Sequence, residues 1–249
     1  MFRPRLALAS LSGQSDAAWA RAGADTAGAA ILGGIALCEP SRAAARDLVA
    51  RGRTEFLPPD PVAFVDEQFA RLDAVPIRPG INVRTTSAEP IRAVGRVCRA
   101  HNGLLEINAH CRQDELCAVG CGETLLCEPS RLCAYVAAGV ETGATVGVKM
   151  RAEVTGVDLA ELIQAIEGAG ATYVHLDAMD SPESVQTVAG AGDCFVIANN
   201  GVRDVDTVET YASKGADAVS IGRPSDDPAV RRRVARAVRD RLEQKLPAD

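Results

Sequence analysis

The amino-acid sequence predicts an α/β protein that forms a single (β/α)8 barrel, also called a TIM barrel. Short apolar runs recur about every 25 to 35 residues, and a helical pattern follows each of them. The chain has 249 residues, a length typical of eight strand–helix units closed into a barrel. We expect one domain over residues 1–249, because no linker or low-complexity segment divides the chain.

The eight predicted strands are short, rich in Val, Ile and Leu, and mostly continuous rather than alternating. This pattern is typical of strands buried on both faces of a parallel sheet. An open, doubly wound sheet is the alternative, but that fold usually carries a G-x-G-x-x-G fingerprint after its first strand, and residues 10–16 read SLSGQSD. The predicted strands are Leu6–Ala9, Ala29–Leu37, Ile81–Arg84, Leu104–Ala109, Val146–Arg151, Tyr173–Ala178, Phe195–Asn199 and Ala218–Gly222.

Helix start signals lie between the later strands. Side chains of Asp and Ser accept hydrogen bonds from the free N–H groups of a first helical turn, and proline tolerates its first position. Glycines end these helices, as at Gly143, Gly168 and Gly215. The predicted starts are Glu128-Pro129-Ser130, Asp158, Ser181-Pro182, Asp204 and Asp226-Asp227-Pro228.

Charge and hydropathy exclude several classes of protein. The net charge of −6 disfavours a protein that binds nucleic acid with its whole surface. The longest charge-free apolar stretch, Thr26–Cys38, is shorter than the roughly 18 to 20 residues of a membrane span. Leu6–Ala9, behind the basic Met1–Arg5, is too short for a secretory signal. We therefore expect a cytoplasmic protein with reduced cysteines.

Polar residues end or follow seven of the predicted strands. In a (β/α)8 barrel the loops after the strands meet at one rim, where the chemistry takes place. We expect these residues to converge there as a candidate active site. They are Ser10, Ser12, Asn82, Arg84, Asn108, His110, Cys111, Arg112, Gln113, Lys149, Arg151, His175, Asp177, Asn199, Asn200, Gly201, Gly222 and Arg223.

Two glycine-containing loops predict a phosphate site. Gly222-Arg223 follows the eighth strand, and Asn200-Gly201 follows the seventh. The loops after strands seven and eight of such barrels often bind phosphate with free backbone N–H groups. The alternative is that both are ordinary turns.

A lysine and a cysteine are candidates for chemistry. Lys149 lies within an apolar strand, where its charge is costly unless it faces a ligand or pairs with Glu106 or Asp177. Cys111 follows the fourth strand, beside His110, and can serve as nucleophile, metal ligand or proton donor. The alternative for Cys111 is a small buried packing residue.

Two further features are weaker. The spacing C-x5-C-x3-C-x5-C-x5-C from Cys111 to Cys133 does not match the tight pairs of zinc or iron–sulfur sites, so no metal site is expected. The last predicted helix has Arg232, Arg236 and Arg239 on one face. That face is either merely solvated or a foothold for a phosphate backbone.

An ordered set of motifs resembles the tRNA-dihydrouridine synthases. The segments that carry the resemblance are EINAHCRQ at 106–113, GCGETLL at 120–126, VKMR at 148–151, His175, NGV at 200–202 and IGR at 221–223. The resemblance spans nearly the whole barrel. The chain departs from the family pattern at His110 and Arg112, where the family has glycine and proline, and at Asp177, where it has arginine. The C-terminal helical domain that grips tRNA in bacterial members is not expected here.

The resemblance implies an FMN cofactor reduced by NAD(P)H, and reduction of uridine to dihydrouridine in tRNA. It gives the proton-donor role to Cys111 and substrate binding to Arg112 and Arg151. The alternatives are a dihydroorotate or dihydropyrimidine dehydrogenase-like enzyme that acts on a free pyrimidine, and a non-catalytic flavin- or nucleotide-binding barrel. The cofactor-binding residues that it implies are Ser10, Asn82, Asn108, Lys149, His175, Asn200, Gly201, Gly222 and Arg223.

Overall fold

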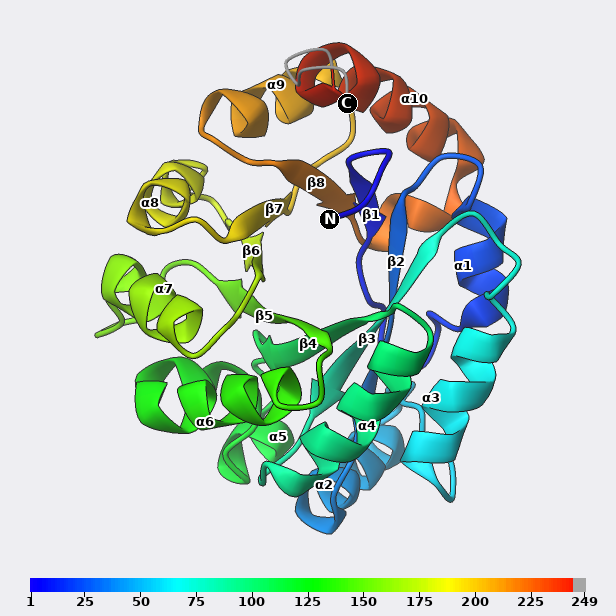
Figure 1. The fold of residues 1–249 in the computed structure, drawn as a ribbon, viewed down its shortest axis with the longest axis vertical. Helices are drawn as coiled ribbons and strands as arrows, with labels where there is room; N and C mark the ends of the chain where they lie inside the picture. The colour runs from blue at the N-terminus through cyan, green and yellow to red at the C-terminus, as the bar shows by residue number, and fades with distance from the viewer. Residues whose placement is uncertain (244–249) are drawn as a thin grey trace.

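A computed structural model of the protein, which describes residues 1–243, shows a closed barrel of eight parallel strands in sequence order, β1 to β8 (Figure 1). The helices form a ring outside the strands, as the sequence predicts. The strands are β1 (Leu6–Leu8), β2 (Ala29–Ala36), β3 (Arg78–Arg84), β4 (Leu104–Ala109), β5 (Thr145–Arg151), β6 (Tyr173–Asp177), β7 (Phe195–Asn199) and β8 (Ala218–Ile221).

The predicted strands are confirmed with small differences in their ends. Pairing of β1 with β8, with Leu6 opposite Val219, closes the barrel. The largest difference is at β3, which starts at Arg78 instead of Ile81. Pro79 and Gly80 are turn residues in most contexts, but here they continue the pairing with β2.

Helices connect successive strands. The connection from β2 to β3 and the connection from β4 to β5 each contain more than one helix. Asp158, Asp204 and Asp227 cap α7, α9 and α10 through their side chains, as predicted, whereas Ser181-Pro182 precedes α8 without a side-chain cap. The helices are α1 (Ala17–Gly23), α2 (Glu39–Ala50), α3 (Pro61–Ala70), α4 (Glu89–Ala100), α5 (Asp114–Ala118), η1 (Gly122–Cys127), α6 (Pro129–Val140), α7 (Leu159–Gly168), α8 (Glu183–Ala191), α9 (Val205–Ser213), η2 (Arg223–Asp226), α10 (Pro228–Val238) and η3 (Arg239–Glu243).

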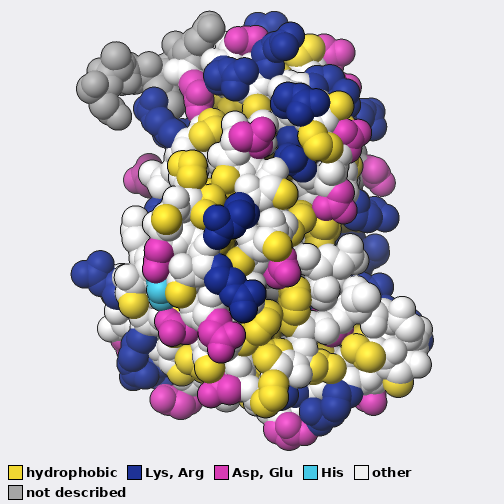
Figure 2. All heavy atoms as spheres, turned by 90° about the vertical axis from the view of Figure 1, so that its right-hand side faces the viewer, with side chains coloured by type: hydrophobic (Ala, Val, Ile, Leu, Met, Phe, Trp, Pro, Cys, Tyr) yellow, Lys and Arg dark blue, Asp and Glu magenta, His cyan; other side chains and the backbone are white. Residues whose placement is uncertain are grey.

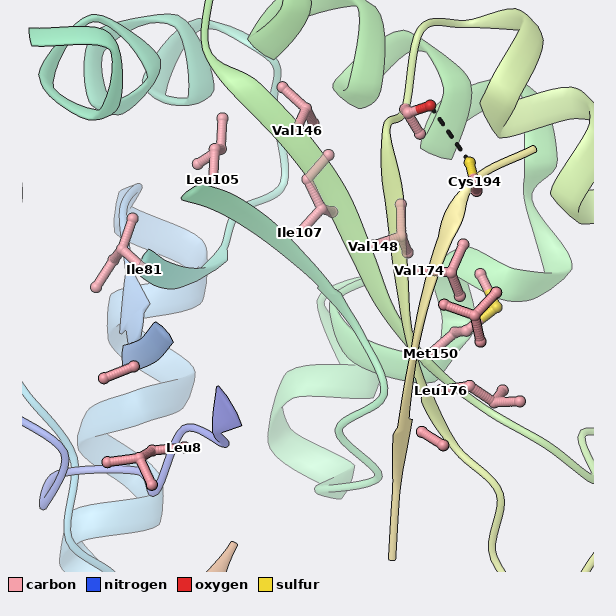
Figure 3. Packing of buried hydrophobic residues seen from close by; sticks show 14 of the residues in the cluster. Leu8, Ile81, Leu105, Ile107, Val146, Val148, Met150, Val174, Leu176 and Cys194 are labelled. Atoms are coloured by element: carbon pink, nitrogen blue, oxygen red, sulfur yellow. Dashed lines mark hydrogen bonds between the residues drawn. The ribbon is translucent and has the colours of Figure 1, made fainter. Parts of the chain in front are cut away.

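The strands β3 to β6 have an apolar outer face and a polar inner face. Residues such as Ile107, Val148 and Leu176 pack outward against the helices in the main core (Figure 3). The alternate residues, such as Glu106 and Lys149, are buried outside that apolar core. The predicted burial of the strands on both faces is confirmed, but the inner face of these strands carries polar residues: alternation places one residue in the helix-facing core and the next inside the barrel.

An apolar layer fills the bottom of the barrel. Tyr173 is fully buried in it, and its ring occupies the space beside Gly147, where a Cβ atom would lie 2.4 Å from the ring. The Tyr173 hydroxyl donates to the carbonyl oxygen of Leu105 at 3.2 Å. This layer closes the lower end, so the polar residues lie above it, toward the carboxyl ends of the strands. No helix in residues 1–243 is long and apolar enough to cross a membrane.

Candidate functional site

A cavity of about 480 Å³ opens at the carboxyl ends of the strands, and we call it the rim cavity. Ser10 and Lys149 line it together with the loops after β7 and β8. A second cavity, of about 430 Å³, has Arg78 and His101 in its wall, at the start of β3 and after α4. The rim cavity brings together nine of the residues predicted to converge at the rim: Ser10, His110, Lys149, Asp177, Asn199, Asn200, Gly201, Gly222 and Arg223.

The loops after β7 and β8 expose backbone toward the rim cavity. A Cβ atom built at Gly201 or Gly222 would meet no other atom within 4 Å, so both glycines border open space. Asn200 and Gly201 have positive φ angles of 93° and 65°, and the Asn200 carbonyl accepts from the Tyr211 hydroxyl at 2.8 Å. This turn geometry also suits the ordinary-turn alternative. Both loops line the same cavity, which is compatible with the predicted phosphate site.

Lys149 is buried in the wall of the rim cavity without a partner. Its residue is 4% exposed, and within residues 1–243 its ammonium group forms neither a hydrogen bond nor an ion pair. The structural alternative of a pair with Glu106 or Asp177 is therefore not realised in the described chain. Burial lowers the pKa of Lys149, and the charges of Glu106 and Asp177 only partly oppose this effect. A buried cation that lines a cavity is suited to bind a negatively charged group.

A chain of buried polar side chains crosses the barrel beneath the rim cavity. Asn108 Nδ2 donates to Asn82 Oδ1 and Asn82 Nδ2 donates to Glu106 Oε1, each at 2.7 Å, and His175 Nδ1 lies 2.7 Å from Glu106 Oε2. Ser220 Oγ then lies 2.8 Å from His175 Nε2 and 2.8 Å from Asn199 Oδ1. Asn82, Asn108 and His175, which the resemblance places at the flavin, thus lie beneath the cavity wall instead of in it.

The buried chain stays polar because each member is satisfied by the next. Burial raises the pKa of Glu106, but the charge of His175 and its hydrogen bond outweigh burial, so the pKa of Glu106 lies below its usual value. Burial lowers the pKa of His175, and the charge of Glu106 only partly opposes this effect. Ser220 and Asn199 also line the rim cavity, so the chain fixes part of its floor.

His110 and Asp177 form a contact that the sequence did not reveal. His110 Nε2 lies 2.7 Å from Asp177 Oδ2, although the residues are 67 positions apart. Both residues line the rim cavity, and the His110 side chain is 31% exposed. Burial lowers the pKa of His110. The sequence placed both residues at the rim, one after β4 and one at the end of β6, but did not pair them.

Cys111 lies on the same rim, one residue beyond His110, but it is not part of the cavity wall. Its backbone N–H donates to Asn108 Oδ1 at 3.0 Å, and its carbonyl accepts from the Glu123 N–H at 2.9 Å. Cys111 packs against an apolar cluster that contains Leu116 and Cys121. Gly122 makes this packing possible, because a Cβ atom there would lie 2.1 Å from the Cys111 carbonyl oxygen.

The two predicted substrate-binding arginines lie outside the wall of the rim cavity. Arg112 is exposed beyond β4. Arg151 is buried at the end of β5, where its Nη1 lies 3.1 Å from Glu123 Oε2. Arg203 is an exposed cavity residue that the sequence did not single out, because it follows Asn200-Gly201 in a loop without a motif.

Comparison by sequence finds a distant relative without an assigned function. No protein-family model matches the chain. An uncharacterized protein of Methanocaldococcus jannaschii is 25% identical over 225 residues, which cover 90% of this chain and 81% of that protein.

Solved structures of similar shape share little sequence with this chain. FabK from Thermotoga maritima matches 89% of this chain with a TM-score of 0.58 and 15% identity, and the chain spans only 58% of FabK. A chain of the tryptophan synthase complex from Pyrococcus furiosus matches with a TM-score of 0.59 and 12% identity, over 98% of this chain and 100% of that one. At these identities the structures give the fold alone.

Proposed function

We propose that the protein is an FMN-dependent oxidoreductase that uses NAD(P)H to reduce the C5–C6 double bond of a uracil ring in tRNA. The observation that carries the proposal is Lys149, which is buried without a hydrogen bond or ion pair among residues 1–243, in a cavity bordered by the two glycine loops. Neither a solvated surface nor a packed core accounts for a lysine in this position. The motif resemblance supplies the identity of the cofactor.

The residues present fit such a cofactor. A cavity of about 480 Å³ lies within the range of small-molecule sites, roughly 300 to 1,000 Å³. The open backbone at Gly201 and Gly222, with the Arg223 guanidinium beside them, suits a phosphate group. Lys149, across the barrel on β5, suits the electron-rich edge of a flavin ring.

Bound FMN would supply hydride transfer, and the protein would supply binding, orientation and charge. Lys149 would stabilise negative charge that develops beside it. The buried chain from Asn108 to Ser220 would hold the strand ends in place, because every polar group in it already has a partner. Ser10 would border the cofactor from the loop after β1.

A positively charged surface supports an RNA substrate. Arg203 and Arg223 are exposed at the rim cavity, and Arg233 of α10 donates through Nε to the Arg203 carbonyl at 2.7 Å. Figure 2 shows Lys and Arg side chains gathered at the end of the molecule that carries α10. Here the apolar face of α10 is buried through Val234 and Val238, which leaves the predicted arginines outward.

Neutralising Arg232, Arg236 and Arg239 together to glutamine is expected to weaken tRNA binding at low salt and to flatten its salt dependence. Each lost phosphate contact removes up to about 0.7 to 0.9 from the slope of log K against log salt. Binding measured between about 50 and 200 mM salt checks this expectation. The matched control changes Arg53, Arg96 and Arg99, which are also exposed but lie elsewhere on the surface. An unaltered slope in the α10 variant would exclude this surface as the RNA site.

A free pyrimidine, oxidised or reduced as in dihydroorotate and dihydropyrimidine dehydrogenases, is the second candidate substrate. The net charge of −6 favours it over a polyanion. Turnover of unmodified tRNA, free uracil and dihydroorotate by the flavin-loaded protein separates the two candidates. Reoxidation of the reduced protein by tRNA alone supports the first, and reoxidation by a free base alone supports the second.

A further inference from the structure

We propose that His110 gives a proton to C5 of the pyrimidine in reduction and removes it in the reverse reaction, while the adjacent C6 accepts or loses the hydride. Asp177 is the positioning residue for His110. This inference rests on the proposed function. It starts from the contact of His110 with Asp177 at 2.7 Å, which lies in the wall of the rim cavity beside Lys149.

The His110 ring is held in place on several sides. Its backbone N–H donates to Asn108 Oδ1 at 3.2 Å, so the buried polar chain also fixes this loop. Asp177 is fixed in turn, because its Oδ1 accepts from the Met179 N–H at 3.1 Å. With Nε2 at Asp177, the other ring nitrogen, Nδ1, has no partner in residues 1–243, and the residue lines the rim cavity.

The charged groups around His110 keep the ring neutral at neutral pH. Lys149 and Arg151 on β5 add their charges to burial in lowering the pKa of His110, and only Asp177 opposes them. His175 on β6 also interacts with His110, and burial lowers the pKa of His175. Burial raises the pKa of Asp177, but the hydrogen bond with His110 outweighs burial, so Asp177 is a carboxylate. A neutral imidazole whose Nε2–H donates to a carboxylate presents Nδ1 as the basic atom.

Cys111 is less well placed for the same role. It packs against Leu116 and Cys121 outside the cavity wall, and its carbonyl also accepts from the Cys117 thiol at 3.5 Å. The adjacent imidazole belongs to the cavity wall, with Lys149 and Asp177.

The proposed reaction transfers one hydride and one proton. In reduction, the C5–C6 π bond breaks, C6 accepts a hydride that originates from NAD(P)H, and C5 accepts the proton from protonated His110. The neutral imidazole then regains a proton from water. In the reverse direction neutral His110 takes the C5 proton while the hydride leaves C6 for the oxidised flavin.

The decisive experiment compares His110→Gln and Asp177→Asn with the unaltered protein, all loaded with FMN. We expect His110→Gln to slow reoxidation by unmodified tRNA about 100-fold or more, and to affect FMN uptake and reduction by NAD(P)H much less. His101→Gln is the matched control, because His101 also contacts two carboxylates, Asp66 and Asp73, but lines the other cavity. Absence of FMN uptake by the unaltered protein would refute the proposed function. Normal FMN reduction with reoxidation within about threefold of normal in His110→Gln, or a loss seen only in Cys111→Ala, would overturn the inference alone.

The pH profile gives a second test with a definite sign. The donor must be protonated and its pKa lies below 6.5, so reoxidation by the pyrimidine is expected to fall as pH rises above that value, by up to about tenfold per unit. The reverse, dehydrogenating reaction needs neutral His110, so its rate is expected to rise with pH below the pKa of His110 and to level off above it. Both dependences should vanish in His110→Gln. A profile that is identical in the variant would contradict the assignment.

Nitrogen NMR of the flavin-free protein tests the pair without turnover. The chain has three histidines, so the signals can be assigned with the single variants. His110 is expected as the Nε2–H tautomer with a pKa below 6.5, whereas the pKa of His101 lies above it because of Asp73 and Asp66, despite its partial burial. Asp177→Asn should alter the tautomer of His110 and leave that of His101 unchanged. An Nδ1–H tautomer in the unaltered protein would overturn the inference.

Discussion

Lys149→Met is expected to stabilise the flavin-free protein and, at the same time, to weaken FMN binding strongly. Methionine fills a similar volume without a charge, so it removes the cost of burying an ammonium group that has no partner in the described chain. We expect a gain of about 1 to 3 kcal/mol in the free energy of unfolding. Loss of a charge-assisted contact of about 1.5 to 3 kcal/mol should weaken FMN binding roughly 10- to 100-fold. Thermal unfolding and flavin titration measure the two effects.

The stability difference should depend on pH with a definite sign. The ordinary pKa of lysine, 10.5, applies to the unfolded chain, and burial lowers the pKa of Lys149 in the folded state below it. Between the folded and unfolded pKa values, the unfolded chain therefore binds more protons than the folded protein. The stability of the unaltered protein therefore rises with pH across that window, and the advantage of Lys149→Met shrinks. Lys214→Met is the matched control, because Lys214 pairs at the surface with Glu183 and should affect stability by less than about 1 kcal/mol. Normal FMN affinity in Lys149→Met would remove Lys149 from the site.

Gly122→Ala is expected to destabilise the protein by roughly 3 to 5 kcal/mol and to lower Tm by about 10 °C. Two costs combine at this position. The φ angle of 68° disfavours any residue with a Cβ atom, and that atom would lie 2.1 Å from the Cys111 carbonyl oxygen. Because the clash is with backbone, the loop that carries His110 and Cys111 must move. Thermal unfolding and the rate of flavin reoxidation together measure the effect.

Gly156→Ala separates the two costs. Gly156 has a φ of 80°, but a Cβ atom there would meet nothing within 4 Å. It should therefore show only the conformational cost, about 1 to 2 kcal/mol. Equal destabilisation by the two substitutions would show that the close approach of Gly122 to Cys111 has no energetic importance.

The sequence predicted the barrel because its signals are local and repeated. Each strand run is followed by a helical pattern, and Asp158, Asp204 and Asp227 cap their helices as expected. The sequence did not predict the start of β3, because Pro79 and Gly80 usually indicate a turn, although proline is also found at the first residues of a strand.

The site was predictable to the extent that it follows from strand ends. Lys149, Gly201 and Gly222 lie at the rim cavity because every strand of a parallel barrel delivers its carboxyl end to one rim. The depth of each residue was not predictable. His175 lies only two residues before Asp177, yet it is buried beneath the cavity while Asp177 lines it. The contact between His110 and Asp177 depends on the stagger of β4 against β6, which no local pattern encodes.

The most direct measurement of the central claim is equilibrium binding of FMN and of riboflavin, which lacks the phosphate, to the unaltered protein. The account predicts one FMN per chain, held at least about tenfold more tightly than riboflavin, because the loops with Gly201 and Gly222 bind the phosphate. Competition by inorganic phosphate should weaken FMN more than riboflavin. Absence of FMN uptake, or equal affinity for the two flavins, would contradict the account.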